Sequence, residues 1–96
     1  MIFNNKTVII TGGSEGVGAA AARKFAAAGA NLMLVARSRK NLDAIAAELR
    51  EQTRVEVYAM DVSEAEDCVN LFKKTEYEFG RVDVLVNNAG FHERGA

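Results

Sequence analysis

Three glycines at the spacing G-x-x-x-G-x-G, directly behind a short apolar run, constrain the fold of this chain more than any other feature. The run Val8-Ile9-Ile10 leads into TGGSEGVG, residues 11–18, and an alanine-rich segment follows. β-branched residues before a glycine loop and a helix-forming segment after it indicate a strand, a tight turn and a helix N-terminus. The free amide N–H groups of such a helix end favour binding of a diphosphate. The alternative is an ordinary turn between strand and helix, in which glycines supply a positive φ or close packing.

The rest of the chain continues the alternation of apolar runs and helical segments. Strands are predicted at 6–11, 31–36, 55–60 and 82–87, and helices at 16–28, from Ser38 to about residue 49, and from Ser63 to 79. Ser38 and Ser63 are the expected N-caps, and Glu66 completes a capping box with Ser63. Gly29 and Gly80 are expected to end the first and third helices.

Apolar residues at helical spacing predict which side of each helix packs on the sheet. They are Val17, Ala21, Phe25 and Ala28 in the first helix, Leu42, Ile45, Ala46 and Leu49 in the second, and Ala65, Val69, Phe72 and Phe79 in the third.

Four strands alternating with three helices predict an α/β fold of the form βαβαβαβ. Right-handed crossovers make the sheet parallel, and the expected strand order is 3-2-1-4. A crevice is then expected between the first and fourth strands at their carboxyl ends, where such sheets bind ligands. The 96 residues fit a single dinucleotide-binding domain, 1–96. This domain is expected to be incomplete, because a full dinucleotide-binding domain contains two mononucleotide-binding halves and is longer.

The composition narrows the class of protein and of partner. A hydrophobic fraction of 49% with 26% charged residues is typical of a globular protein, and the net charge of −1 gives no reason to expect nucleic acid or membrane as a partner. Cys68 is the only cysteine, which excludes an intrachain disulfide and a thiolate zinc site. No apolar run is long enough to span a membrane, so a cytoplasmic protein is expected.

The end of the second predicted strand indicates which dinucleotide would fit. NAD sites commonly carry an acidic residue there for the adenosine ribose, whereas this chain has Ala36 followed by Arg37 and Ser38. A guanidinium can pair with a 2′-phosphate, so NADP(H) is favoured over NAD(H). A solvated basic start to the next helix is the alternative, and Glu15 would oppose a 2′-phosphate if it faced one.

Two further segments follow predicted strands at the same edge of the sheet. Asp61 can accept a hydrogen bond from an adenine amine, and Val62 can supply an apolar wall beside the adenine. The alternative is that Asp61 only caps the following helix. Asn side chains in the segment 87–90 can join neighbouring strand ends, and Ala89 and Gly90 let a ribose approach the backbone. A simple strand-ending turn is the alternative there.

The order and spacing of these segments resemble the short-chain dehydrogenase/reductase family over residues 6 to 90, in particular its classical, NADP(H)-preferring subgroup. The resemblance implies a Rossmann-like sheet and a cofactor site, with the diphosphate and ribose near the glycine loop, the 2′-phosphate at the turn after residue 36, and adenine at the third strand end. The residues implied in cofactor binding are Gly12, Ser14, Gly16, Val17, Gly18, Arg37, Ser38, Asp61, Val62, Asn88, Ala89 and Gly90.

The family's catalytic residues have no counterpart in these 96 residues. Its members transfer hydride with a Tyr-x-x-x-Lys pair and a serine, whereas Tyr58 is followed four residues later by Val62, and Tyr77 by Arg81. No catalytic residue and no metal site is therefore predicted, and the chain alone is expected to be inactive.

Two other functions are alternatives to the interpretation of this chain as the cofactor-binding part of an oxidoreductase. One is a non-enzymatic nucleotide-sensing or oligomerising fragment that self-associates through its incomplete sheet. The other is a methyltransferase-type fold for S-adenosylmethionine, against which Ala36-Arg37 speaks because such folds usually carry an acidic residue there.

Overall fold

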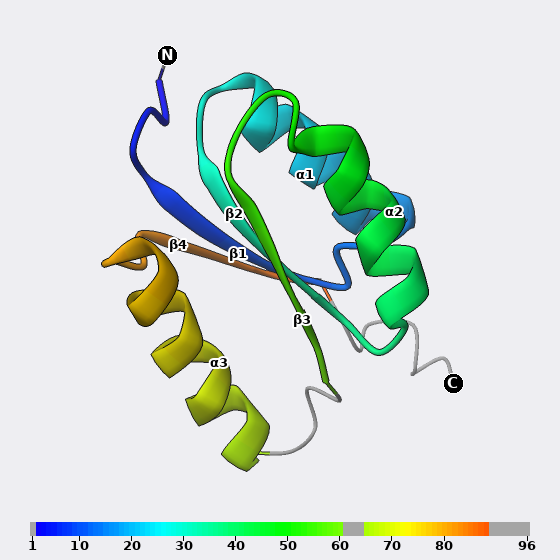
Figure 1. The fold of residues 1–96 in the computed structure, drawn as a ribbon, viewed down its shortest axis with the longest axis vertical. Helices are drawn as coiled ribbons and strands as arrows, with labels where there is room; N and C mark the ends of the chain where they lie inside the picture. Colours follow the sequence, from blue (N-terminus) through cyan, green and yellow to red (C-terminus); the bar gives the residue numbers. More distant parts are fainter. Residues whose placement is uncertain (1, 61–64, 89–96) are drawn as a thin grey trace.

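The chain forms one parallel four-stranded sheet with helices on both faces, as the computed structural model in Figure 1 shows. The structure describes residues 2–60 and 65–88. The elements are β1 (Thr7–Thr11), α1 (Gly16–Ala27), β2 (Asn31–Ala36), α2 (Arg39–Leu49), β3 (Val55–Ala59), α3 (Ala65–Phe79) and β4 (Val84–Asn87). The strand order is β3-β2-β1-β4, which confirms the predicted topology.

The helices divide between the two faces of the sheet. α1 and α2 cover one face and α3 covers the other (Figure 1). Alternate residues of β1 accordingly enter different cores, with Ile10 packed among residues of α1 and α2, and Ile9 packed with Leu71 of α3. Because both faces of β1 are covered, all five of its residues are buried, as expected of a central strand in a parallel sheet.

Glycine ends two helices where the sequence predicted it. Gly29 has φ +91°, its N–H donates to the Ala26 carbonyl at 3.0 Å, and the Ala30 N–H donates to the Phe25 carbonyl at 3.0 Å. These two bonds are the Schellman pattern that closes a helix C-terminus. Gly80 follows α3 with φ +82°, and its N–H donates to the Glu76 carbonyl at 2.8 Å.

The predicted buried side is correct for α2 and wrong for parts of α1 and α3. In α1 the buried residues are Gly18, Ala19, Ala22 and Ala26, whereas Val17 is 74% exposed. The smallest residues face the sheet, which lets the helix approach it closely.

In α3, Leu71 and Thr75 are buried, whereas Val69 and Phe72 are 53% and 39% exposed. Thr75 can face the core because its hydroxyl donates to the Leu71 carbonyl at 2.8 Å. Ala65 is exposed and Phe79 half-buried. The predicted cap Ser63 lies outside the described residues.

A charged cluster joins β4 to β1 at the amino end of the sheet. The Thr7 N–H donates to the Asp83 carboxylate at 2.8 Å, and the Asp83 N–H donates to the Thr7 carbonyl at 2.9 Å. Arg81 donates to both oxygens of the same carboxylate, each at 2.8 Å. These bonds fix the start of β4 beside β1 and so set where its carboxyl end lies.

No helix in the part of the chain that the structure describes is long and apolar enough to cross a membrane.

Candidate functional site

The glycine loop lies at the carboxyl end of β1 and is anchored to β2. Gly12 and Gly16 have φ of +68° and +58°, a conformation that side chains with a Cβ rarely adopt. Between them, the Gly13 N–H donates to the Val35 carbonyl at 3.1 Å, and a Cβ on Gly13 would lie 3.1 Å from the Ile10 carbonyl oxygen. The loop therefore needs glycine for its backbone shape and for its close packing.

Gly18 brings the first turn of α1 against the loop. A Cβ on Gly18 would collide with the carbonyl group of Gly12 and would lie 3.1 Å from the side-chain nitrogen of Asn88. The Ala19 N–H bonds the Glu15 carbonyl at 3.3 Å, and the amides before it in α1 have no intrahelical acceptor. The helix end thus offers N–H donors, with its positive dipole end, at the crevice that the topology creates.

Thr11 connects the glycine loop to the end of β4. Its hydroxyl donates to Asn87 Oδ1 at 3.0 Å and accepts from the Asn88 N–H at 2.9 Å. The Asn87 side chain therefore joins two strand ends, the role that the sequence suggested. Thr11 itself was missed, and a hydroxyl residue at the last position of a buried strand is the only signal that could have identified it.

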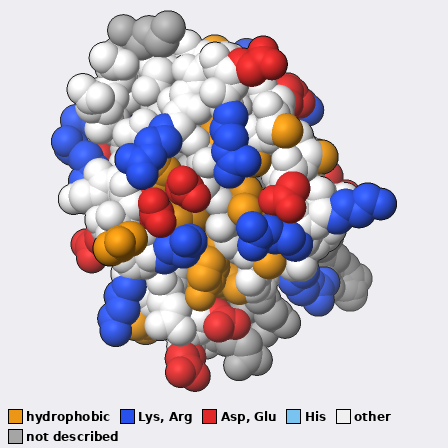
Figure 2. All heavy atoms as spheres, viewed as in Figure 1, with side chains coloured by type: hydrophobic (Ala, Val, Ile, Leu, Met, Phe, Trp, Pro, Cys, Tyr) orange, Lys and Arg blue, Asp and Glu red, His pale blue; other side chains and the backbone are white. Residues whose placement is uncertain are grey.

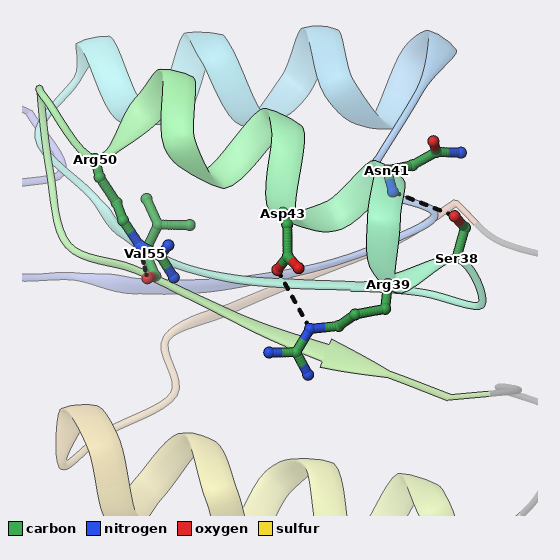
Figure 3. Close-up of polar contacts among 6 residues, drawn as sticks. All are labelled: Ser38, Arg39, Asn41, Asp43, Arg50 and Val55. Atoms are coloured by element: carbon green, nitrogen blue, oxygen red, sulfur yellow. Dashed lines mark hydrogen bonds and ion pairs between the residues drawn. The ribbon is translucent and has the colours of Figure 1, made fainter.

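Ser38 and Arg37 form the turn between β2 and α2. The Ser38 hydroxyl accepts the Asn41 N–H at 3.2 Å, so it is the N-cap of α2, as predicted (Figure 3). Its own proton remains available to a ligand. Arg39 is paired with Asp43 at 3.2 Å, whereas exposed Arg37 has no ion pair within residues 2–60 and 65–88.

The structure brings together only part of the predicted set. Gly12, Gly16, Gly18 and Asn88 lie around one loop, Ser14 is half-buried within it, and Val17 is exposed at the start of α1. The Arg37–Ser38 turn follows the strand to which the loop is anchored. The remaining predicted residues, Asp61, Val62, Ala89 and Gly90, lie outside the described part of the chain.

On the one face that Figure 2 draws, charge is mixed rather than separated by sign. Basic and acidic side chains lie interspersed there between apolar ones. Among the described residues, no group of His, Cys, Asp and Glu side chains could hold a metal ion. The local arrangement at the glycine loop is therefore the main candidate for ligand chemistry.

Comparison with known proteins gives consistent results. Residues 6–96 match the family model described as short chain dehydrogenase. The chain is 40% identical over 96 residues to meso-2,3-butanediol dehydrogenase of Serratia marcescens. Among solved structures, it is similar to L-sorbose reductase from Gluconobacter frateurii complexed with NADPH and L-sorbose, with a TM-score of 0.87, 39% identity and 94% of the chain covered. A metagenomic short-chain oxidoreductase in complex with NADP gives a TM-score of 0.88 at 35% identity, with 94% of the chain covered.

The chain is much shorter than these relatives. It covers 38% of the butanediol dehydrogenase, 36% of the sorbose reductase and 41% of the metagenomic oxidoreductase. The similarity therefore concerns the part of each relative that corresponds to β1 through β4.

Proposed function

The chain belongs to the short-chain dehydrogenase family, and we propose that its glycine loop and Arg37–Ser38 turn bind NADP(H) as the cofactor-binding part of an oxidoreductase. The observation that carries the proposal is the packing of Gly18 against Gly12, because a residue without a side chain at this position lets the first turn of α1, with its free amides, lie directly against the glycine loop. A diphosphate suits such a helix end, since the N–H groups and the dipole both favour negative charge.

The preference for NADP(H) over NAD(H) rests on Arg37 and on the residue before it. Position 36 at the end of β2 is alanine, so no carboxylate there repels a 2′-phosphate. Arg37 is exposed and has no ion pair in the described part of the chain, and a guanidinium pairs with phosphate through two parallel hydrogen bonds. The Ser38 hydroxyl can donate a further bond while it caps α2.

The bound nicotinamide cofactor would supply or accept the hydride in carbonyl reduction or alcohol oxidation. Within the 96 residues there is no Tyr-x-x-x-Lys pair to move the accompanying proton. We therefore expect this chain to bind the dinucleotide without turning over a carbonyl substrate. Any turnover by the purified chain above that of a Gly16→Asp variant would contradict this part of the proposal.

Calorimetric titration with NADPH, NADH and S-adenosylmethionine tests the cofactor assignment. NADPH is expected to bind most tightly, and Arg37→Asp is expected to remove its advantage over NADH. The matched control is Lys73→Asp, the same charge change at an exposed position of α3. Equal affinity for NADPH and NADH in the unmodified chain would refute the 2′-phosphate site, and binding of S-adenosylmethionine alone would refute the dinucleotide site.

A second candidate function is self-association, and the free edge of the sheet favours it. Within residues 2–60 and 65–88, β4 pairs only with β1, and Leu85, which neighbours the buried Ile9 in the register, is 48% exposed. An uncovered apolar strand edge is a template for pairing with another chain. We propose that two copies meet at β4.

Sedimentation velocity at several concentrations tests this second candidate. A dimer is expected for the unmodified chain and a monomer for Leu85→Lys, because a lysine on each copy would oppose pairing. Ile2→Lys, at a position that is 80% exposed in the N-terminal segment, is the matched control. A monodisperse monomer of the unmodified chain would rule the idea out.

A further inference from the structure

Apolar side chains are exposed where α3 meets the outer strand β4. Leu85 of β4 is 48% exposed, and Val69 and Phe72 of α3 are 53% and 39% exposed. Val84 and Val86 pack against the core under α1 and α2, so Leu85 between them lies on the α3 face of the sheet. Within residues 2–60 and 65–88, α3 is the only helix on that face (Figure 1).

The exposed apolar residues of α3 lie on the flank that faces β4. The other flank faces β3, because Glu78 accepts a hydrogen bond at 3.4 Å from Arg54, the residue before β3. Leu71, which is buried against the sheet, lies between Glu78 and Phe72 around the helix. Val69 lies three residues before Phe72 and shares its flank. We call the surface formed by Ala65, Val69, Phe72 and Leu85 the α3–β4 corner.

The handedness of the crossovers indicates what kind of segment fits the α3–β4 corner. The chain passes from β1 to β2 and β3 with α1 and α2 on one face, and it returns from β3 to β4 with α3 on the other face. A right-handed crossover that continued outward from β4 would carry its helix on the face of α3, beside α3 and over β4. The α3–β4 corner lies at this place, and the apolar stripe of an amphipathic helix can cover it.

The relatives carry polypeptide for such a crossover. This chain covers 38% of the butanediol dehydrogenase and 36% of the sorbose reductase, so most of each relative lies outside the part that corresponds to β1 through β4. A second copy of this chain is a different kind of occupant. The self-association proposed above uses the backbone edge of β4 rather than the side chains of the α3–β4 corner.

We propose that the α3–β4 corner binds an amphipathic helix of a second polypeptide, the part of a short-chain dehydrogenase that follows the strand equivalent to β4. This inference rests on the proposal that the chain is one part of an oxidoreductase. Burial of Val69, Phe72 and Leu85 under the helix drives association. The strand after that helix pairs with the free edge of β4, so the partner competes there with a second copy of the chain.

Co-expression tests the proposal. The affinity-tagged 96-residue chain is produced together with the part of the Serratia marcescens butanediol dehydrogenase that follows the strand equivalent to β4. The two are expected to purify as one complex, whose dissociation on dilution is followed by sedimentation velocity. Val69→Lys and Phe72→Lys are each expected to weaken binding by about tenfold or more, the effect of losing one buried apolar side chain. Thermal unfolding checks that each variant is folded.

Tyr77→Lys is the matched protein control. Tyr77 is 86% exposed and lies three residues after Lys74, which pairs with Glu78 at 3.6 Å on the flank away from the α3–β4 corner. The change introduces the same lysine in place of an exposed apolar side chain of the same helix. This variant is expected to bind the partner as the unmodified chain does.

A second measurement does not depend on the solubility of the separate partner. In a fused polypeptide, the same part of the dehydrogenase follows residue 96, and Cys68→Ser removes the native thiol. Val69→Cys is then expected to react with iodoacetamide more slowly than in the 96-residue chain. Tyr77→Cys is expected to react equally in both.

Four results would overturn the proposal. They are a soluble partner that does not purify with the chain, binding that both lysine variants leave unchanged, equal labelling of Val69→Cys in the two polypeptides, and a dimer of the chain alone that Val69→Lys dissociates. The last result would assign the α3–β4 corner to a second copy. No dinucleotide is present, so a chain that binds NADPH but not the partner refutes only this inference, and the opposite result refutes only the cofactor site.

Discussion

The hydroxyl of Thr11 lies 3.0 Å from Oδ1 of Asn87, and this bond joins the end of β1 to the end of β4 beneath the glycine loop. The same oxygen accepts the Asn88 N–H at 2.9 Å. Thr11 is 5% exposed, so these bonds are largely shielded from solvent. They hold two chain segments that are separated by 76 residues at the edge where the ligand is proposed to bind.

Replacing the Thr11 hydroxyl tests this connection directly. Thr11→Val keeps the side-chain shape but leaves the Asn88 N–H and the Asn87 side chain without this partner, so the free energy of unfolding is expected to fall by about 1–3 kcal/mol. Thr11→Ser keeps the hydroxyl and loses one methyl group, at a cost of about 1 kcal/mol. Urea denaturation of both variants measures the difference, and a Thr11→Val variant as stable as the unmodified chain would show that the bond contributes nothing.

Gly18→Ala tests the close packing of α1 on the loop. Alanine normally stabilises a helix interior relative to glycine by about 1 kcal/mol. Here the added Cβ collides with the Gly12 carbonyl, so the variant is expected instead to lose about 1–3 kcal/mol and to bind NADPH more weakly. Thermal unfolding and calorimetry measure the two effects.

Gly16→Ala provides the contrast, because a Cβ there has nothing within 4 Å but φ is +58°. Its loss should come from the left-handed backbone alone, about 1–2 kcal/mol. A Gly18→Ala variant more stable than the unmodified chain would contradict the packing that the structure gives.

The sequence predicted those parts of the fold that depend on strong local patterns. Apolar strand runs between glycines predicted four strands and their order, and the large residues Leu42, Ile45 and Leu49 predicted the buried side of α2. The alanine-rich α1 has no such contrast between its sides, so Val17 was placed wrongly. In α3 apolar residues lie on two sides, and only packing on the sheet selects Leu71 over Val69.

For the candidate site, the glycine loop was predictable because its backbone demands specific residues in a continuous segment. The Thr11–Asn87 bond was only partly predictable, since no local pattern links residues so far apart in the sequence. Arg39 forms an ion pair with Asp43, which leaves Arg37 as the guanidinium of this turn without an ion pair in the described part of the chain. The sequence alone could not predict this difference, because either arginine could pair with Asp43 or with a ligand.

The Asp83 cluster predicts a specific dependence of stability on pH. Hydrogen bonds from the Arg81 side chain, and then from the Thr7 backbone, lower the pKa of Asp83 below its ordinary value. A carboxyl group whose pKa is lower in the folded state stabilises the fold above its unfolded pKa of about 3.9, and this contribution disappears as the pH falls through the folded pKa.

Comparison of the unmodified chain with Asp83→Asn across pH 2 to 7 measures this contribution. The variant is expected to be less stable by a constant amount above about pH 5, and the gap is expected to narrow below about pH 4, where the wild-type carboxylate becomes protonated. Arg81→Gln should reduce the same pH-dependent difference, because it removes the largest cause of the shift. A gap that stays constant down to pH 2 would mean that the ionisation of Asp83 does not contribute.

The orientation of α3 can be tested by two truncations two residues apart. Leu71 is 2% exposed and packs with Ile9 and Met33, so Leu71→Ala should leave a cavity and lower the free energy of unfolding by about 2–5 kcal/mol. Val69 is 53% exposed, and Val69→Ala should change stability by no more than about 0.5 kcal/mol. Chemical denaturation of both variants gives the comparison. If Val69→Ala proved the more damaging change, α3 would be rotated so that the side predicted from its spacing faces the sheet.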